Sequence, residues 1–206
     1  MPSPFKPETS ALLLIDHQVG VMQMIKTLQV DDVKRLVLAI AKAAKVLKMP
    51  IILTTSVETA FQQPIFKELA EVLPAEYKAR IKRKGIVNAW TDPNFKAAVE
   101  KTGRKQLIMG AVTTDICLVY PAVSAVEEGY EVQAVMDISG SPTWIGEDMA
   151  RRRMEAAGVR LTATSTLIAE LAQDWSTSEG KKLAEIMSSS VNPPVRQLAP
   201  SEAAPV

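Results

Sequence analysis

The feature that most constrains the fold is an alternation of short apolar runs with longer segments of helical periodicity, repeated along the chain. Residues 11–15 (ALLLI) are apolar at consecutive positions, as in a strand that is covered on both faces. Residues 30–48 instead carry their apolar side chains on one helical face. Repeated strand–helix–strand units predict parallel strands joined by right-handed crossovers. We therefore predict an α/β fold in three layers, with helices on both faces of a parallel sheet.

The same pattern predicts an element for almost every part of the chain. Strands are expected at residues 11–15, 51–55, 79–81, 106–109, 130–136 and 159–162. Helices are expected at residues 30–48, 64–73, 94–101, 114–128, 147–157, 167–174 and 180–188. A length of 206 residues suits one domain, which we place at residues 1–190. Residues 191–206, rich in Pro, Ala and Ser, are expected to form a separate tail.

Composition and charge exclude several classes of protein. The net charge of +1 gives no electrostatic basis for binding nucleic acid or an anionic membrane. No apolar run reaches the roughly 18 residues needed to cross a bilayer, and the segment MPSPFKPETS lacks the apolar core of a secretory signal. One cysteine cannot form an internal disulfide, and with one histidine it falls short of a zinc site. We expect a cytoplasmic protein with no nucleic-acid or membrane partner and no metal or cofactor.

Three reactive segments follow predicted strands. In open parallel sheets, ligands bind beyond the carboxyl ends of the strands, near the point where the strand order reverses. Asp16 follows the first strand, the basic run at residues 80–84 follows the third, and Cys117 follows the fourth. If the strand order is 3-2-1-4-5-6, strands one and four flank that reversal. This order would bring Asp16 and Cys117 face to face.

Cys117 ends the segment GAVTTDIC, in which a glycine and capping Thr and Asp residues place it in the first turn of a helix. The free N–H groups and the dipole of such a turn are expected to lower the pKa of the thiol. The same N–H groups could hold the oxyanion of a tetrahedral intermediate. The alternative is that Cys117 is a small buried apolar residue, and its position alone does not decide between the two.

Asp16 and the basic run also allow more than one interpretation. A carboxylate at the end of an apolar strand is costly to desolvate unless it is hydrogen-bonded or functional, but its commoner role is to cap the next helix. His17 allows a His–Cys dyad, which we rank below the Asp16–Cys117 pair. Residues 80–84 are either a solvated strand edge or supply one inward cation, which would favour a thiolate and keep a nearby Asp ionised.

Four separated segments together resemble one family. They are ALLLIDHQVG, KRKGIVNAW, QLIMGAVTTDICLVYPAVSAVEEGYEV and VMDISG. In order and content they are similar to the isochorismatase-like cysteine hydrolases, over about residues 11–175. The similarity is strongest to the YcaC-type subgroup, through the motifs DHQ, TTS, R-x-G-x-x-NAW and E-L-x-x-D-W. The resemblance implies a Rossmann-like fold whose six-stranded parallel sheet has the order 3-2-1-4-5-6.

The resemblance also implies a catalytic set made of an Asp, a Lys or Arg, and a Cys. These residues map here onto Asp16, Arg83 and Cys117. A one-residue shift of the middle position would select Lys84 in place of Arg83, and the sequence leaves that choice open.

The resemblance further implies a cis peptide bond at Val112–Thr113. This bond would direct the Thr113 N–H, together with the N–H of Cys117, at the oxyanion. Motif residues on loops at the same end of the sheet are expected to contact the substrate: Thr54, Asn88 and Trp90.

Departures from the family pattern narrow the predicted chemistry. Nicotinamidase-type members carry an Asp-x-His…His metal site after the second strand, but the matching residues 54–66, TTSVETAFQQPIF, contain no histidine. The presence of Cys117 argues against the vinyl-ether cleavage of members that lack this cysteine. The prediction is a metal-independent hydrolase that cleaves a small amide or ester through a Cys117 thioester, in a homo-oligomer such as an octamer.

Two other functions fit the same residues. A non-hydrolytic member of the fold could use the thiol to sense oxidants or to bind a ligand. A structural component of an oligomer could retain only a vestigial pocket. A Cys117 thiol within proton-transfer distance of Asp16 favours the hydrolase over the structural component.

Overall fold

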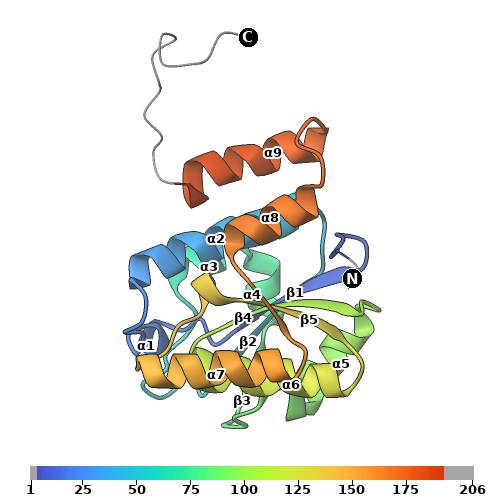
Figure 1. The fold of residues 1–206 in the computed structure, drawn as a ribbon. Helices are drawn as coiled ribbons and strands as arrows, with labels where there is room; N and C mark the ends of the chain where they lie inside the picture. Colours follow the sequence, from blue (N-terminus) through green and yellow to red (C-terminus); the bar gives the residue numbers. More distant parts are fainter. Residues whose placement is uncertain (1–3, 193–206) are drawn as a thin grey trace.

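The computed structural model describes residues 4–192. Its centre is a six-stranded parallel sheet with helices on both faces (Figure 1). The strand order is β3-β2-β1-β4-β5-β6, so the predicted fold class and order are confirmed. The strands are β1 Ser10–Ile15, β2 Ile51–Ser56, β3 Ile81–Arg83, β4 Gln106–Ala111, β5 Glu131–Val135 and β6 Arg160–Thr162.

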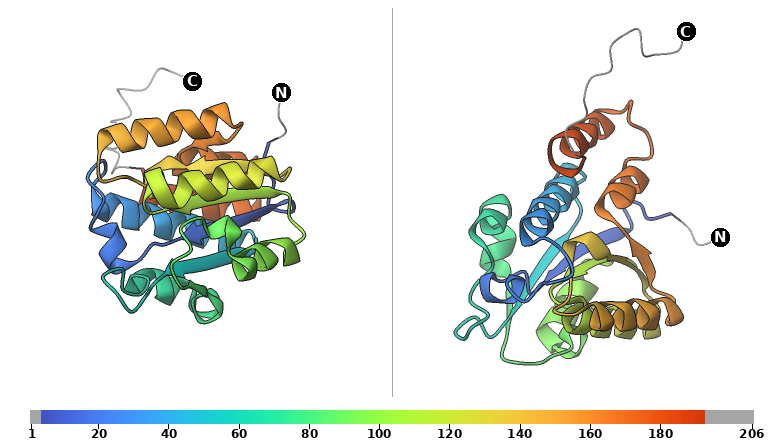
Figure 2. Two further views of the ribbon diagram at one scale, coloured as in Figure 1. Left: turned by 90° about the horizontal axis from the view of Figure 1, so that it is seen from below. Right: turned by 60° about the vertical axis from the view of Figure 1, so that its left-hand side comes forward.

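The helices form two layers around this sheet. They are α1 Val19–Met22, α2 Val30–Val46, α3 Lys67–Val72, α4 Pro74–Ala79, α5 Pro93–Lys101, α6 Val119–Glu127, α7 Trp144–Ala156, α8 Thr164–Ala172 and α9 Ser178–Ile186. Helices α2, α3 and α8 cover one face of the sheet, and α5, α6 and α7 cover the other (Figures 1 and 2). Helix α9 lies outside α2 and α8 and packs on both.

The uninterrupted apolar run of β1 is explained by its burial on both faces of the sheet. Successive side chains of a strand point to opposite faces, and both faces of this sheet are covered. One core contains Leu12 and Leu14, and the other contains Ala11, Leu13 and Ile15. Every residue of β1 is buried. The ALLLI run is therefore the sequence signature of a central strand in a three-layer fold.

The third strand differs from its prediction. It was expected at residues 79–81 but spans Ile81–Arg83, where it pairs with the end of β2. The preceding residues form the unpredicted helix α4, which begins at Pro74, a position where proline's fixed φ favours a helix start. The shift makes Arg83 the last residue of β3, paired in register with Ser56. The basic residue therefore lies at the carboxyl edge of the sheet.

Strands β1 and β4 lie side by side at the point where the strand order reverses. Ile15 pairs with Ala111, and the Val112 N–H donates to the Ile15 carbonyl at 3.1 Å. Asp16, the next residue after β1, therefore lies beside the start of the segment that leads to Cys117. The topology brings these two residues together, as the predicted strand order requires.

Two further predictions concern regions beyond the sheet. Within residues 4–192, none of the helices combines the length and apolar character needed to cross a membrane. The predicted tail at residues 191–206 lies outside the described residues from residue 193 onward. Its first residue, Val191, still belongs to a π-helical turn, Met187–Val191, that follows α9.

Candidate active site

Asp16 lies immediately beyond β1 and is 1% exposed. Its backbone has a φ of +58°, which is uncommon for a residue other than glycine. Two hydrogen bonds hold this part of the chain in place. The Asp16 N–H donates to the Thr54 carbonyl at 3.0 Å, and Nε2 of the next residue, His17, bonds the Ile138 carbonyl at 2.8 Å. Several anchors therefore determine the direction of the Asp16 carboxylate.

Gln18 supplies a further anchor, which the sequence analysis did not assign. Its side-chain Oε1 accepts the Ser56 N–H at 2.8 Å, and its Nε2 donates to the Ser56 carbonyl at 2.9 Å and to the Gln63 carbonyl. The amide thus binds the end of β2 and the loop that follows it. In the motif Asp16-His17-Gln18, the second and third residues hold the first between the ends of two neighbouring elements.

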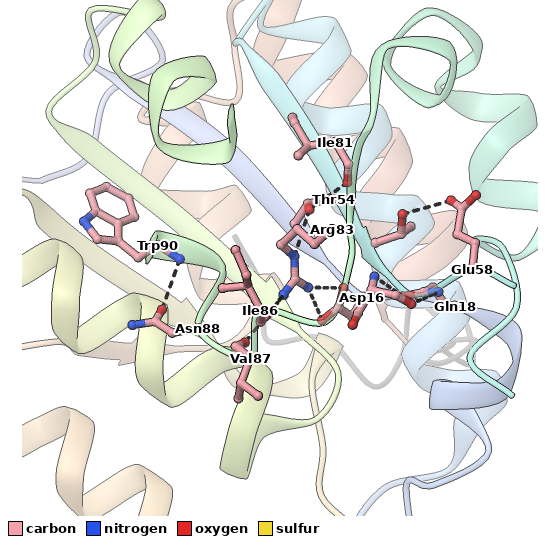
Figure 3. Close-up of polar contacts among 12 residues, drawn as sticks. Asp16, Gln18, Thr54, Glu58, Ile81, Arg83, Ile86, Val87, Asn88 and Trp90 are labelled. Carbon is pink, nitrogen blue, oxygen red and sulfur yellow. Dashed lines mark hydrogen bonds and ion pairs between the residues drawn. The ribbon is translucent and has the colours of Figure 1, made fainter. Parts of the chain in front are cut away.

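Arg83 pairs with Asp16 through both carboxylate oxygens, and the guanidinium and carboxylate are both buried (Figure 3). The remaining guanidinium nitrogens are also bonded: Nε donates to Thr54 Oγ1 at 3.1 Å, and Nη1 donates to the Ile86 carbonyl at 2.6 Å. Lys84, the alternative from the sequence, is exposed. Arg83 is therefore the cation that faces Asp16.

Cys117 lies in a π-helical turn, Thr114–Leu118, that precedes α6. The predicted single helix from residue 114 is thus divided into two parts. The thiol interacts with the Asp16 carboxylate through a hydrogen bond and accepts a bond from the Thr113 backbone N–H. The Val112–Thr113 peptide bond is cis, as expected. The residue as a whole is partly exposed.

The pKa of Cys117 contradicts the sequence-based expectation. Burial raises it well above its ordinary value, and the negative charge of Asp16 and the hydrogen bond to that carboxylate raise it further. The Thr113 N–H and the charge of Arg83 lower the same pKa, but by less. The prediction of a lowered thiol pKa was wrong because it considered the helix terminus and omitted burial beside a carboxylate.

The pKa of Asp16 is also raised from its ordinary value, because burial outweighs the opposing charge and hydrogen bonds of Arg83. Both shifts disfavour an isolated charge on either group. The arrangement instead favours one proton held between the thiol and the carboxylate, with Arg83 supplying the balancing positive charge. A site of this kind can transfer that proton to and from sulfur without solvent.

His17 does not form the alternative dyad. Its ring bonds the Ile138 carbonyl instead of Cys117, and burial lowers the pKa of His17 to about 4. Its Nδ1 has no hydrogen-bond partner among the described residues. At neutral pH the imidazole is therefore uncharged, and its position is that of an anchor for the end of β1.

The three residues expected to contact the substrate each have structural contacts. Thr54 Oγ1 accepts from Arg83 and donates to the Ile81 carbonyl at 2.8 Å. The Asn88 side chain caps a 3₁₀ turn by accepting the Trp90 N–H at 3.0 Å. Trp90 is 2% exposed and packs edge-on against Tyr130, with ring centroids 5.1 Å apart. Their contact with a substrate stays a prediction.

The same end of the sheet offers few metal ligands. Among residues 4–192, no group of three or more His, Cys, Asp or Glu side chains is placed to hold a metal ion. The groups gathered at the site are a carboxylate, a guanidinium, a thiol and a backbone N–H. This combination suits nucleophilic attack by sulfur with a neighbouring proton acceptor.

Comparison with known proteins identifies the family. The family model for the isochorismatase domain matches residues 10–166. The probable hydrolase YcaC of Escherichia coli (strain K12) is 40% identical over 166 residues, which make up 81% of this chain and 79% of that protein. The chain belongs to the isochorismatase family.

Two solved structures of YcaC proteins match this isochorismatase-family chain closely. YcaC from Pseudomonas aeruginosa, solved with hexane-2,5-diol and covalent acrylamide, has a TM-score of 0.87 and 36% identity, and the match covers 93% of both chains. The Escherichia coli YcaC structure, described as an octameric hydrolase of unknown specificity, has a TM-score of 0.87 and 37% identity over 93% of both chains. The predicted resemblance to the YcaC-type subgroup is confirmed, and the chain is a YcaC-like hydrolase of the isochorismatase family.

Proposed function

We propose that this chain is a cysteine hydrolase that cleaves a small amide or ester through a thioester on Cys117. The observation that carries the proposal is the contact of the Cys117 thiol with the Asp16 carboxylate, which is itself paired with Arg83. The Cys117 thiol can attack as a thiolate only if a neighbouring group accepts its proton. Asp16 provides that acceptor at the reacting atom.

The first half of the reaction forms the thioester. Asp16 accepts the Cys117 proton as sulfur attacks the substrate carbonyl carbon, and the carbonyl oxygen gains the negative charge. The N–H groups of Thr113 and Cys117 stabilise this oxyanion. The C–N or C–O bond then breaks, and Asp16 returns the proton to the leaving amine or alcohol.

The second half releases the acid. Water attacks the thioester carbonyl and gives its proton to Asp16, and the C–S bond breaks as that proton returns to sulfur. Arg83 remains positively charged throughout and holds the Asp16 carboxylate in place. A positioned acid–base group contributes about 10²–10⁴ to the rate, and an oxyanion donor about 10²–10³.

The test is acylation of the single cysteine. The protein is incubated with a panel of small amides and activated esters, and its intact mass is measured before and after a chase in fresh buffer. We expect a mass gain equal to the acyl group, located at Cys117 by peptide mapping, that decays as the thioester hydrolyses. The Cys117→Ala variant should show no adduct and no turnover while keeping the fold, as judged by circular dichroism.

A redox-sensing function predicts a different outcome. A sensor thiol is a low-pKa, accessible thiolate that oxidises rapidly, whereas the pKa of Cys117 is raised. Rapid conversion of Cys117 to a sulfenic acid by dilute peroxide, with no acyl adduct from any amide or ester, would refute the hydrolase proposal. Turnover of a confirmed substrate by Cys117→Ala would refute the role of the cysteine.

We further propose that the chain works as a cytoplasmic homo-oligomer. The support is the octameric YcaC of Escherichia coli, whose structure matches this chain over 93% of both lengths. Its small-molecule substrate remains to be identified by the panel above. Light scattering coupled to size-exclusion chromatography measures the assembly directly, and a monomer at micromolar concentration would contradict it.

A further inference from the structure

The segment VMDISG, residues 135–140, begins at the end of β5 and contributes no residue to the proposed catalytic set. Its last three residues, which we call the ISG turn (residues 138–140), are all buried. Hydrogen bonds join this turn to the two connections that carry the site, the one after β1 and the one after β4. The bonds to the connection after β4 come from Ser139 and Gly140.

The Ser139 hydroxyl lies where hydrogen bonding between β4 and β5 ends. The last residues paired between these strands are Met109 and Ala134. Beyond them, Ser139 Oγ accepts the Ala111 N–H at 3.2 Å and donates to the Val135 carbonyl at 2.9 Å. Buried backbone groups require such partners. The side chain therefore takes the place of a strand-to-strand hydrogen bond and holds the last residue of β4.

Thr114 binds the ISG turn from the other side of Thr113. The Thr114 N–H donates to the Gly140 carbonyl at 2.9 Å, and Thr114 Oγ1 accepts the Gly140 N–H at 2.6 Å. Thr114 and Ser139 are both 0% exposed, so water does not compete for these bonds. The Thr113 N–H, which bonds the Cys117 sulfur, thus belongs to a stretch of chain that the turn holds both before and after it.

The ISG turn also holds the connection that carries Asp16. The Ile138 carbonyl bonds Nε2 of His17, the next residue after Asp16, at 2.8 Å. The turn packs directly on β4, because a Cβ added to Gly110 would lie 2.3 Å from Ile138 Cδ1. One buried turn therefore sets the position of the carboxylate side of the site and of its N–H side.

We propose that Thr114 and Ser139 are positioning residues, which direct the Thr113 N–H at the oxyanion that forms when Cys117 attacks an acyl carbon. The inference rests on the proposed function, because that oxyanion forms only in acyl transfer. A donor must lie about 2.7–3.1 Å from the charged oxygen, so a small displacement of the peptide weakens its contribution. Both side chains act through the backbone that they hold.

The test compares two reactions of the same thiol. Acetylation by p-nitrophenyl acetate forms the C–S bond at a carbonyl carbon, passes through an oxyanion and releases p-nitrophenolate. Alkylation by iodoacetamide forms the C–S bond at a saturated carbon as iodide leaves, and no oxyanion forms. Both reactions begin from the Cys117 thiolate, so a change in the thiolate fraction alters both rates together and leaves their ratio unchanged. Intact mass and p-nitrophenolate absorbance follow the two rates.

In Thr114→Val and Ser139→Ala we expect the ratio of acetylation to alkylation rate to fall by about 10-fold or more, since an oxyanion donor contributes about 10²–10³ and is here displaced, not removed. Thr114→Ser keeps the hydroxyl and should restore most of the wild-type ratio. Ser10→Ala is the matched control. Ser10 is also 0% exposed, and its Oγ donates to Gln106 Oε1 at 3.3 Å at the amino end of β1. Its ratio should equal that of the wild type.

The outcomes separate this inference from the proposed function. An unchanged ratio in Thr114→Val and Ser139→Ala proteins that circular dichroism shows to be folded would overturn the inference, and so would an equal fall in Ser10→Ala. If Thr114→Val does not fold, Ser139→Ala, which removes a single oxygen atom, decides the result. A wild type that is alkylated at Cys117 but acylated by no ester or amide of the panel refutes the hydrolase itself, and this inference with it.

Discussion

The two ends of the same sheet distribute polar and apolar groups in opposite ways. At the carboxyl end, the ion pair of Asp16 and Arg83 and the His17 ring are buried, while large apolar side chains are exposed. At the amino end, ion pairs such as Arg160–Glu131 and Lys96–Glu128 lie at the surface. The amino end therefore follows the usual rule that charges stay in water.

Hydrogen bonds show the same contrast. At the amino end, the Gln106 side chain joins the starts of β1 and β4 by accepting from Thr9 Oγ1 at 2.6 Å and from the Lys6 N–H at 3.2 Å. These bonds close the end of the sheet and involve neutral groups. At the carboxyl end, Thr54 instead bonds a buried guanidinium. Local rules are broken where function requires it, so the unusual end is the one that carries the site.

The largest difference in stability between variants at the carboxyl and amino ends of the sheet should come from Asp16→Ala. Removing the carboxylate leaves the Arg83 guanidinium buried without its partner, which we expect to lower the free energy of unfolding by about 3–5 kcal/mol. Urea unfolding measures the change. Glu131→Ala, which breaks the surface pair with Arg160 at the amino end, should lower it by less than about 1 kcal/mol.

A double variant sharpens this comparison. In Asp16→Ala with Arg83→Met, neither charge remains buried, so much of the lost stability should return although the site is inactive. Equal losses from Asp16→Ala and Glu131→Ala would mean that the Asp16–Arg83 pair is hydrated like a surface pair. Asp16 would then not differ from the surface carboxylates at the amino end of the sheet.

The second effect is the pH dependence contributed by His17, the single histidine of the chain. Its pKa is 6.5 as an ordinary value and about 4 in the folded protein. The unfolded chain therefore takes up the proton first, and acidification from pH 6.5 to pH 4 favours unfolding. A shift of this size corresponds to about 3 kcal/mol.

His17→Gln isolates this contribution, because glutamine keeps an N–H donor for the Ile138 carbonyl and does not titrate. Between pH 7 and pH 4.5, wild-type stability should fall by about 2–3 kcal/mol more than that of the variant. Asp16 and Asp137, whose pKa values are raised by burial, favour the folded state on acidification, but they are present in both proteins. Parallel stability curves would show that the His17 ring is protonated or hydrated when folded.

The sheet was predictable because its central strands are covered on both faces, which leaves consecutive apolar residues in β1 and β4. Prediction failed at β3, an edge strand of three residues in which only Arg83 is buried. It also missed α1, whose four residues carry no helical periodicity. Short elements depend on tertiary contacts, and these contacts have no local pattern in the sequence.

The meeting of Asp16 with Cys117 followed from strand order alone, since both residues lie on the connections that follow central strands. The choice of Arg83 over Lys84 did not follow, because it depends on which face of β3 turns inward. The direction of the Cys117 pKa was wrong because the dominant cause, burial beside a carboxylate, is a property of the assembled core. The sequence thus supplied Asp16 and Cys117, whereas the choice of Arg83 and the direction of the pKa shifts came from the folded structure.

The smallest effect should come from hydroxyl groups with matched hydrogen bonds at the two ends. Thr54 Oγ1 donates to the Ile81 carbonyl and accepts from Arg83 Nε. Thr102 Oγ1 donates to the Val99 carbonyl and accepts from the Arg104 N–H. Replacing either by valine preserves the shape of the side chain and removes both bonds.

Thr54→Val should lower the free energy of unfolding by about 1.5–3 kcal/mol, because it leaves a buried charged donor unpaired, whereas Thr102→Val should lower it by about 0.5–1.5 kcal/mol. Only Thr54→Val should also slow modification of Cys117 by acrylamide, since Arg83 then holds Asp16 less firmly. Equal losses of stability with unchanged Cys117 reactivity would reduce Thr54 to an ordinary structural threonine. The Asp16–Arg83 pair would then owe its geometry to the backbone carbonyl of Ile86 and to the anchors on His17 and Gln18.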